Sequence, residues 1–151
     1  MDIQKDPSPI PHLLRRVGQI ADEMFGAGEI TPRQYAVMRA VAEQPGAHQI
    51  LISRATGIDR STLSEVLRRL QRAGLITIRR DRYEMRRWCS HLTEKGRVQL
   101  EKAESRARAV GASLLEELGA RTVASLEGFV QRHAGVKKAP QRNGRQREAA
   151  P

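Results

Sequence analysis

Apolar residues recur every three or four positions over much of the chain, and this spacing is typical of amphipathic helices. Between Ile10 and Gly28 the pattern predicts a first helix, which Gly26 and Gly28 end. A second helix is expected to begin at Thr31, because its hydroxyl can accept a hydrogen bond from an unpaired amide and the following Pro32 has no amide hydrogen to satisfy. This second helix should stop before Pro45.

Two shorter helices follow, separated by a tight turn. Residues 48–56 predict a third helix, which Gly57 closes. Either Asp59 or Ser61 caps a fourth helix that runs to about Ala73. Two short helices joined in this way have the composition of a helix-turn-helix, in which the second helix enters the major groove of DNA.

The apolar period changes to two after the fourth helix. Residues 75–80 alternate and are rich in β-branched side chains, so they predict a strand, and residues 88–92 predict a returning strand beyond a charged turn. Thr93 caps a long helix that reaches about Leu118, and residues 121–133 predict a final helix. The expected fold class is therefore mainly α-helical with a small β-hairpin.

No repeat or linker divides the chain of 151 residues, so residues 1–134 are expected to form a single domain. Residues 135–151 have almost no apolar content and predict a basic disordered tail. No apolar run reaches the ~18 residues that span a bilayer, and the start lacks the features of a signal peptide. A cytoplasmic location without membrane contact is expected, and a single cysteine agrees with a reducing compartment.

The positive charge is concentrated in two blocks. The net charge of +10 favours a polyanionic partner. Residues 54–88 carry ten Lys and Arg against four Asp and Glu, and residues 135–151 carry five against one. The first block coincides with the helix-turn-helix and the hairpin, so double-stranded DNA is the expected partner.

The fourth helix separates an apolar face from a basic one. Its leucines and Val66 follow the i, i+3, i+4, i+7 rule and should pack on the core. The other side carries hydrogen-bonding groups near the helix start, where a recognition helix meets base edges, and arginines further along that suit phosphates. The residues assigned to bases are Arg60, Ser61, Thr62 and Ser64. Those assigned to phosphates are Arg54, Arg68, Arg69 and Arg72. A solvated charged face is the alternative, but Arg far outnumbers Glu here.

The predicted hairpin gathers arginines around one turn. They are Arg79, Arg80, Arg82, Arg86 and Arg87. Like charges at this density repel one another unless a polyanion is nearby, and an arginine at such a tip can enter the narrow minor groove beside the recognition helix. A merely solubilising turn is the alternative.

Three stretches of the chain resemble the winged helix-turn-helix of the MarR family, the multiple-antibiotic-resistance type regulators of bacteria and archaea. They read LISRATGIDRSTLSEVLRRLQRAGLI, RRDRYEMRRW and LTEKG, and the resemblance runs from about Thr31 to Gly96. The wing of that family typically carries an Asp-x-Arg signature. The matching residues here are Glu84, Met85 and Arg86, a conservative departure that leaves Arg86 as the wing-tip arginine.

The resemblance implies an obligate homodimer. Residues of about 10–28 and 97–133 would interlock with those of a second copy, and each winged part, about 31–96, would bind one half-site of a pseudo-palindromic operator. The apolar stripes of the terminal helices point to the same dimer, because a monomer of this length has nowhere to bury them all. A monomeric helical bundle is the alternative.

The resemblance also implies repression of nearby genes, often relieved by a small, commonly phenolic, ligand. Candidate pocket residues are Met24, Phe25, Tyr35 and Met38, which are at least as well explained as plain core. The histidines are dispersed, and no catalytic, phosphate-loop or metal-ligand spacing is found, so neither an enzyme nor a cofactor is expected.

Three other functions stay open. The basic tail is compatible with an architectural DNA-binding protein without ligand control, since its charge needs no sequence-specific contact. A partner-binding helical bundle whose charge is incidental is the second. The third is a redox-sensing regulator that uses Cys89, because nearby arginines favour a thiolate, although a lone cysteine is more often a small buried apolar residue.

Overall fold

The computed structural model describes residues 9–82 and 87–133. The predicted mainly α-helical class with a small sheet is confirmed. In order along the chain the elements are α1 (Ile10–Phe25), α2 (Pro32–Glu43), β1 (Ala47–His48), α3 (Gln49–Thr56), α4 (Arg60–Arg72), β2 (Ile76–Arg80), β3 (Trp88–Leu92), α5 (Glu94–Leu118) and α6 (Ala120–His133). None of these helices is both long enough and apolar enough to span a bilayer.

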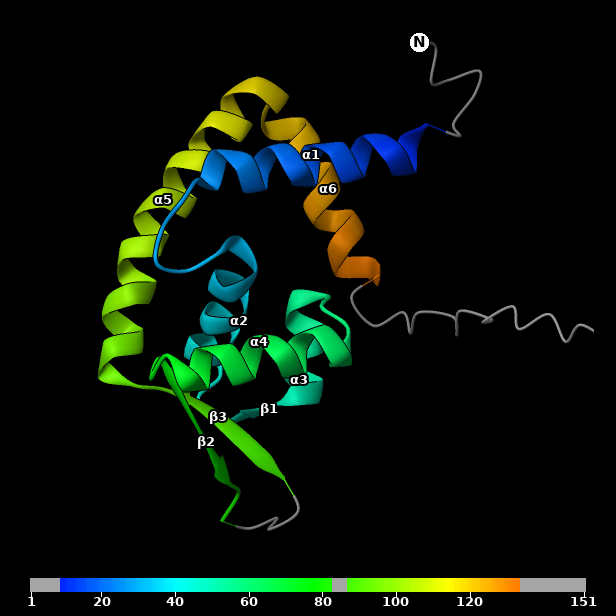
Figure 1. Ribbon diagram of the computed structural model, residues 1–151. Helices are drawn as coiled ribbons and strands as arrows, with labels where there is room; N and C mark the ends of the chain where they lie inside the picture. Colours follow the sequence, from blue (N-terminus) through cyan, green and yellow to red (C-terminus); the bar gives the residue numbers. More distant parts are fainter. Residues whose placement is uncertain (1–8, 83–86, 134–151) are drawn as a thin grey trace, which may run out of the picture.

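The elements form two regions joined by one long helix (Figure 1). The first region, called here the winged part, contains α2, α3, α4 and the sheet. The second consists of α1, the far end of α5 and α6, called here the terminal helices. Figure 1 shows α5 rising from the sheet along one side of the molecule until it meets α1 and α6.

Side chains cap the helices where the sequence predicts a start. Thr31 Oγ1 accepts from the Gln34 amide at 3.2 Å, and Gln34 Oε1 accepts from the Thr31 amide at 2.8 Å. Asp59, rather than Ser61, is the N-cap of α4, and Thr93 caps α5. Such caps pair amide groups that the first turn of a helix leaves without partners.

Helix α1 ends at Phe25, directly before Gly26, which is one of the two glycines expected to end it. The reason is Gly26, whose φ of 71° leaves the helical region at a conformation that glycine adopts without steric cost. The proposed tail, residues 135–151, lies outside the described residues, as do the wing residues 83–86.

The sheet contains one strand that the sequence pattern did not predict. Its order is β1-β3-β2, with both pairs antiparallel. The hairpin pairs β2 with β3 from Ile76 opposite Leu92 to Arg80 opposite Trp88. The two-residue strand β1 pairs with the other edge of β3. This pairing connects the start of α3 to Cys89 and Ser90 of β3.

The core lies in the winged part. The predicted inner face of α4 is confirmed, because Leu63, Leu67 and Leu70 are at most 1% exposed and Val66 is 8% exposed. They pack in one cluster with residues of α2, α3, β2 and α5. Its innermost members also include Val37, Met38, Val41, Ile52, Ile76 and Ala103. The buried leucines fix the rotation of α4, and so its other side faces outward in a defined orientation.

Candidate DNA-binding surface

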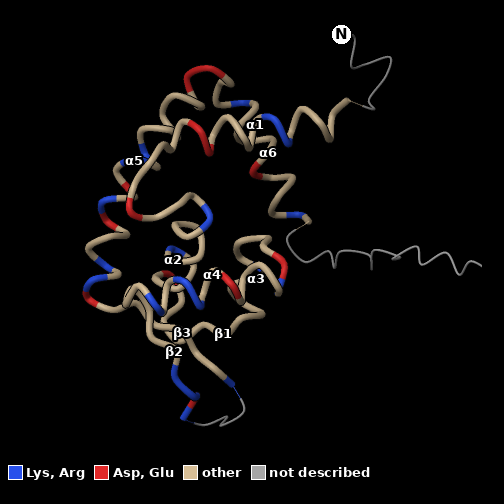
Figure 2. The backbone as a smooth tube through the Cα atoms, viewed as in Figure 1, with Lys and Arg blue, Asp and Glu red and all other residues tan. Residues whose placement is uncertain are grey.

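The outward side of α4 carries several exposed basic residues. Figure 2 shows Lys and Arg along α4, on strand β2 of the hairpin and directly before strand β3. Because successive helical residues are turned by about 100°, Ser61, Arg68 and Arg72 lie opposite the buried face, and all three are exposed. Arg60 is also exposed, whereas Ser64 is half-buried. Arg54 lies exposed in the last turn of α3.

Hydrogen bonds organise the first turn of α4. The Asp59 carboxylate accepts from the Thr62 amide at 3.0 Å and from the Thr62 hydroxyl at 2.8 Å. It also accepts from the Ser61 hydroxyl at 2.6 Å. One turn on, the Ser64 hydroxyl donates to the Arg60 carbonyl at 2.8 Å. Three of the four side chains that were assigned to bases, those of Ser61, Thr62 and Ser64, are therefore held in place by the protein itself.

Two of the predicted DNA contacts lie on the flank of α4 that faces α1 and α2. Thr62 and Arg69 line an open hollow of about 390 Å³ together with Asp22 and the first turn of α2. Arg69 forms an ion pair with Glu65, which lines the same hollow. The structure thus separates these two residues from Ser61, Arg68 and Arg72, which the sequence pattern had grouped with them.

The hairpin presents its arginines to solvent. Arg79, Arg80, Arg82 and Arg87 are exposed. The Arg80 guanidinium lies over the Trp88 ring at 5.1 Å, and Trp88 is itself 52% exposed. A guanidinium stacked on an indole is held in one orientation and keeps its N–H groups for other partners. The predicted wing-tip arginine, Arg86, lies outside the described residues.

Cys89 is buried in the central strand β3, where it lies opposite Arg79 of β2 and His48 of β1. It is 7% exposed, and its Sγ lies 3.5 Å from Asp81 Oδ2. Reactive cysteines are partly exposed to their oxidant in an electropositive setting. The buried position instead matches the structural alternative that the sequence left open.

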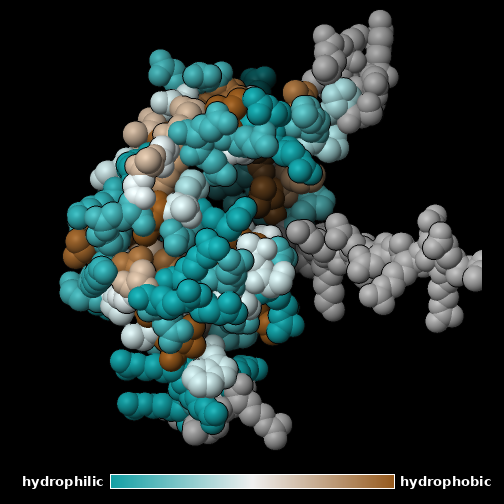
Figure 3. All heavy atoms as spheres, viewed as in Figure 1, coloured by the Kyte–Doolittle hydropathy of each residue, from teal (hydrophilic) through white to brown (hydrophobic). Residues whose placement is uncertain are grey.

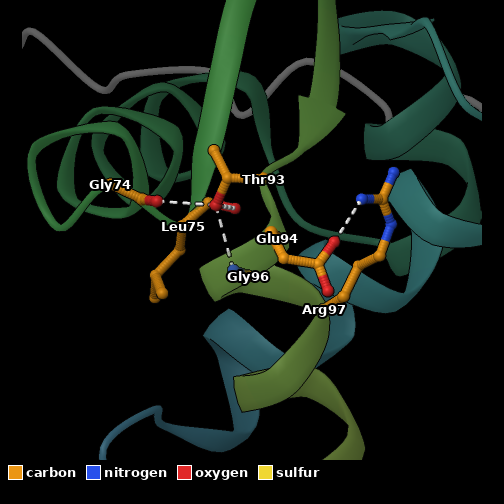
Figure 4. Close-up of polar contacts among 6 residues, drawn as sticks. All are labelled: Gly74, Leu75, Thr93, Glu94, Gly96 and Arg97. Carbon is orange, nitrogen blue, oxygen red and sulfur yellow. Dashed lines mark hydrogen bonds and ion pairs between the residues drawn. The ribbon is translucent and has the colours of Figure 1, made fainter.

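The end of α4 is bound to the start of α5, an arrangement called here the α4–α5 joint (Figure 4). The Thr93 hydroxyl donates to the carbonyls of Gly74, at 2.6 Å, and of Leu75, at 3.1 Å. Lys95 Nζ donates to the Ala73 carbonyl at 3.0 Å. These carbonyls follow the last turn of α4, where a helix leaves acceptors unpaired and its dipole attracts a cation.

A glycine lets the two elements of the joint approach each other closely. A Cβ atom at Gly96 would lie 2.0 Å from the Leu75 carbonyl oxygen, which belongs to the backbone and cannot move aside alone. Sequence reasoning identified Thr93 only as a cap and assigned no role to Lys95 or Gly96. The stretch LTEKG contains all three, but its contacts lie 18 to 22 residues away along the chain.

A second contact joins α5 to the loop between α1 and α2. Arg106 donates to the Ala27 carbonyl at 3.0 Å, and its guanidinium lies over the Phe25 ring at 4.7 Å. The Phe25 ring also packs against the Tyr35 ring, with the two centroids 5.5 Å apart. Arg106 would clash with any side chain at Gly28. The contact therefore connects the end of α1 and the following loop to α5.

The four candidate pocket residues lie in different environments. Phe25 and Met38 are buried in the core, whereas Met24 is 39% exposed. Tyr35 lines a hollow of about 400 Å³ between α2 and α5, together with Arg39, Glu43, Glu104 and Arg108. The pKa of Arg39 is raised because its guanidinium donates to Glu43 and to the Tyr35 hydroxyl. This hollow combines one aromatic ring with several charges.

The terminal helices leave apolar side chains in solvent. No residue of α6, which is fully described, is buried, and Phe129 and Val130 are 53% and 63% exposed. On α1 the exposed apolar residues are Ile10, Leu13, Leu14, Ile20 and Met24. Figure 3 shows apolar atoms open to solvent among these helices. Exposed apolar residues this closely grouped mark an interaction surface.

Comparison with known proteins identifies relatives of this chain in sequence and in fold. The family model described as MarR family matches residues 29–87. Transcriptional regulator HosA of Escherichia coli O157:H7 is 38% identical over 104 residues, which cover 68% of this chain and 74% of HosA. The match to HosA thus extends well beyond the part that the family model covers.

Solved structures agree with this relationship. The PcaV transcriptional regulator of Streptomyces coelicolor, solved with its natural ligand, has a TM-score of 0.75 and 28% identity, and covers 91% of this chain and 98% of its own. The transcriptional repressor CouR, solved on a 23-mer DNA duplex, shares the fold, with a TM-score of 0.72, 24% identity and coverage of 89% and 98%. The protein belongs to the MarR family.

Proposed function

We propose that the protein is a transcriptional regulator that binds double-stranded DNA in a sequence-specific manner as a homodimer. The observation that carries this proposal is the orientation of α4, whose leucines are buried while its polar and basic residues face solvent at a fixed angle. Its relatives support the same conclusion, because HosA and PcaV are both named transcriptional regulators.

In this function α4 enters the major groove and divides its contacts by position. Arg60, Ser61 and Ser64, near the helix start, contact base edges. Arg68 and Arg72 contact phosphates, and Arg54 at the end of α3 adds a further charge beside them. Thr62 and Arg69 line the flank hollow and support α4 from the side of α2.

The hairpin acts as a wing on the neighbouring DNA backbone or minor groove. Arg79, Arg80, Arg82 and Arg87 supply its positive charge, and Arg86 is proposed for its tip from the sequence alone. Each phosphate that they neutralise releases counterions, so affinity should fall steeply as salt rises. The stacked Arg80–Trp88 pair gives this contact a defined geometry.

A second copy of the chain covers the exposed apolar residues of the terminal helices. A two-fold interface pairs identical patches, and it would place two copies of α4 about 34 Å apart, one turn of DNA. This spacing suits a pseudo-palindromic operator. The domain limits follow the same division, with about 31–96 as the DNA-binding part and about 10–28 and 97–133 as dimerisation helices.

The finer proposal is repression that a small ligand relieves. PcaV was solved with a natural ligand, which supports ligand control in a relative. In this chain the hollow beside Tyr35 lies between α2 and α5 and so joins the winged part to the long helix. A ligand that moves α5 would also move α4, because the α4–α5 joint connects them.

Selection of bound sequences from random duplex DNA tests the proposal. A regulator should enrich one pseudo-palindromic sequence and bind it at least ~10³-fold more tightly than scrambled duplex at physiological salt. Small phenolic compounds are then screened for release of the selected duplex. An architectural protein, the second candidate, would bind both duplexes alike, and that result would overturn the proposed function.

A further inference from the structure

Three hydroxyl groups at the start of α4 donate hydrogen bonds to acceptors within the protein. Ser61 Oγ donates to Asp59 Oδ1 at 2.6 Å, and Thr62 Oγ1 donates to Asp59 Oδ2 at 2.8 Å. Ser64 Oγ donates to the Arg60 carbonyl at 2.8 Å. The direction of each bond is fixed by chemistry, since an ionised carboxylate and a carbonyl oxygen can only accept.

A serine or threonine hydroxyl has one proton and two lone pairs. When the hydroxyl hydrogen is bonded to Asp59 or to a backbone carbonyl, only the lone pairs of the oxygen remain, and the hydroxyl can bind a base only as an acceptor. The bond from Ser61 to an ionised carboxylate is charge-assisted and short, which makes it stronger than one between neutral groups. These hydroxyls therefore behave as acceptors, although serine is in general able to pair with any base.

Base pairs differ in whether they can satisfy such an acceptor. In the major groove the hydrogen-bond donors are the exocyclic amino groups of adenine N6 and cytosine N4. Guanine and thymine present the acceptors O6, N7 and O4. An acceptor on the protein facing an acceptor on the base leaves both without a hydrogen, and desolvation of such groups is costly.

We propose that Ser61 and Ser64 read adenine or cytosine through its amino group, and that Asp59 sets this preference at Ser61. The inference rests on the proposed function and deepens it by naming the chemistry of the bases that are read. Asp59 is a positioning residue here, because it acts on the DNA only through the Ser61 hydroxyl. Its role as helix cap is separate and depends on the Thr62 amide.

Arg60, the residue before Ser61, is a hydrogen-bond donor where Ser61 is an acceptor. Its guanidinium is exposed and consists of donors only, so it suits guanine O6 and N7. Arg60 is a donor, whereas Ser61 and Ser64 are acceptors, so these residues of the same helical turn require different bases. The half-site should therefore combine a guanine that depends on Arg60 with adenine or cytosine at the positions that depend on Ser61 and Ser64.

The experiment is the same DNA selection carried out with the wild-type chain and with Ser61→Ala and Ser64→Ala. Each alanine variant identifies the position whose preference it weakens. In the wild-type selection that position should be adenine or cytosine. Guanine or thymine there, or unchanged preferences in both variants, would overturn the inference, whereas absence of any enriched sequence would overturn the proposed function itself.

Two variants at Asp59 separate its effect on the Ser61 hydroxyl from its role as the helix cap. Glycine is tolerated as an N-cap at little cost, so Asp59→Gly should leave α4 folded while it frees the Ser61 proton. Guanine and thymine should then be accepted at the Ser61 position, and the discrimination should fall about five- to tenfold. Asp59→Asn keeps an oxygen for both the Thr62 amide and the Ser61 hydroxyl, and its preference should match the wild type. Circular dichroism melting of both variants checks that the helix is retained.

Removal of a single amino group gives the sharpest test. Where the selected base is adenine, purine lacks only the N6 amino group, and for cytosine the corresponding analogue is 2-pyrimidinone. This replacement should weaken wild-type binding about five- to tenfold and leave Ser61→Ala unaffected. Equal losses for the two proteins would show that Ser61 does not contact that amino group.

Discussion

The winged part and the terminal helices differ in how completely they bury their apolar residues. In α4, Leu63, Leu67 and Leu70 are at most 1% exposed within a single chain. In α6 no residue is buried, and Val130 is 63% exposed. The difference shows that the winged part has its core within one copy, whereas the terminal helices leave an apolar surface exposed in a single chain.

The α4–α5 joint connects these two regions. Thr93 and Lys95 bind the carbonyls that follow α4, and Gly96 allows the backbones to approach. The joint therefore links the position of α4 to the helix that carries the terminal region.

Charges in the apolar face of α6 should abolish dimerisation. We expect Phe129→Asp combined with Val130→Asp to give a monomer by sedimentation and to weaken binding to a two-half-site duplex by at least ~100-fold, because two linked sites exceed one by about 10²–10⁴-fold. The helical content of the winged part should persist. Gln131→Asp, at an exposed polar position of the same helix, is the control, and a dimer in the double variant would refute the assigned interface.

A cavity in the core of α4 should destabilise the winged part itself. Leu67→Ala removes a buried side chain and should lower the free energy of unfolding by about 2–5 kcal/mol in denaturant titrations. The matched control is Gln71→Ala, exposed on the same helix, with an expected change within about 0.5 kcal/mol. Similar values for the two variants would show that the core is not where the buried leucines indicate.

The joint should be sensitive to a single methyl group. Gly96→Ala forces the Leu75 carbonyl to move and should cost about 1–3 kcal/mol of stability and reduce operator affinity. Gly111→Ala lies in the same helix with nothing within 4 Å of its Cβ, and should instead stabilise the helix by about 0.5–1 kcal/mol. If both variants behaved alike, close approach at Gly96 would not be required.

The smallest expected difference is between two arginines of α4, Arg60, which is proposed to contact bases, and Arg68, which is proposed to contact phosphates. Arg60→Ala should reduce the preference for the selected duplex over scrambled DNA by about 1–3 kcal/mol. Arg68→Ala should weaken both by a similar factor and lower the salt slope by about one. Titrations at four salt concentrations measure both quantities, and a loss of preference in Arg68→Ala alone would reverse the two assignments.

The sequence predicted the features that depend on neighbours along the helix. The buried face of α4 follows from the spacing of its leucines, and the starts of α2 and α5 follow from Thr31 and Thr93. These signals are local, and local geometry produces them whatever the rest of the chain does. The order of helices and hairpin could be predicted for the same reason.

Features that depend on distant partners could not be predicted. Strand β1 has two residues and exists because β3 pairs with it. Arg106 binds a carbonyl 79 residues away, and no periodicity encodes that distance. The separation of Thr62 and Arg69 from Ser61 requires the position of α2, which only the packed structure supplies.

The central claim is that two copies of α4 read two half-sites about one turn of DNA apart. The most direct measurement compares the affinity of the chain for the selected duplex with its affinity for the same duplex carrying five additional base pairs between the half-sites. Those base pairs turn one half-site to the opposite face of the DNA. Affinity should fall at least ~100-fold, to that of a duplex with one half-site. Equal affinity for both duplexes would contradict the account.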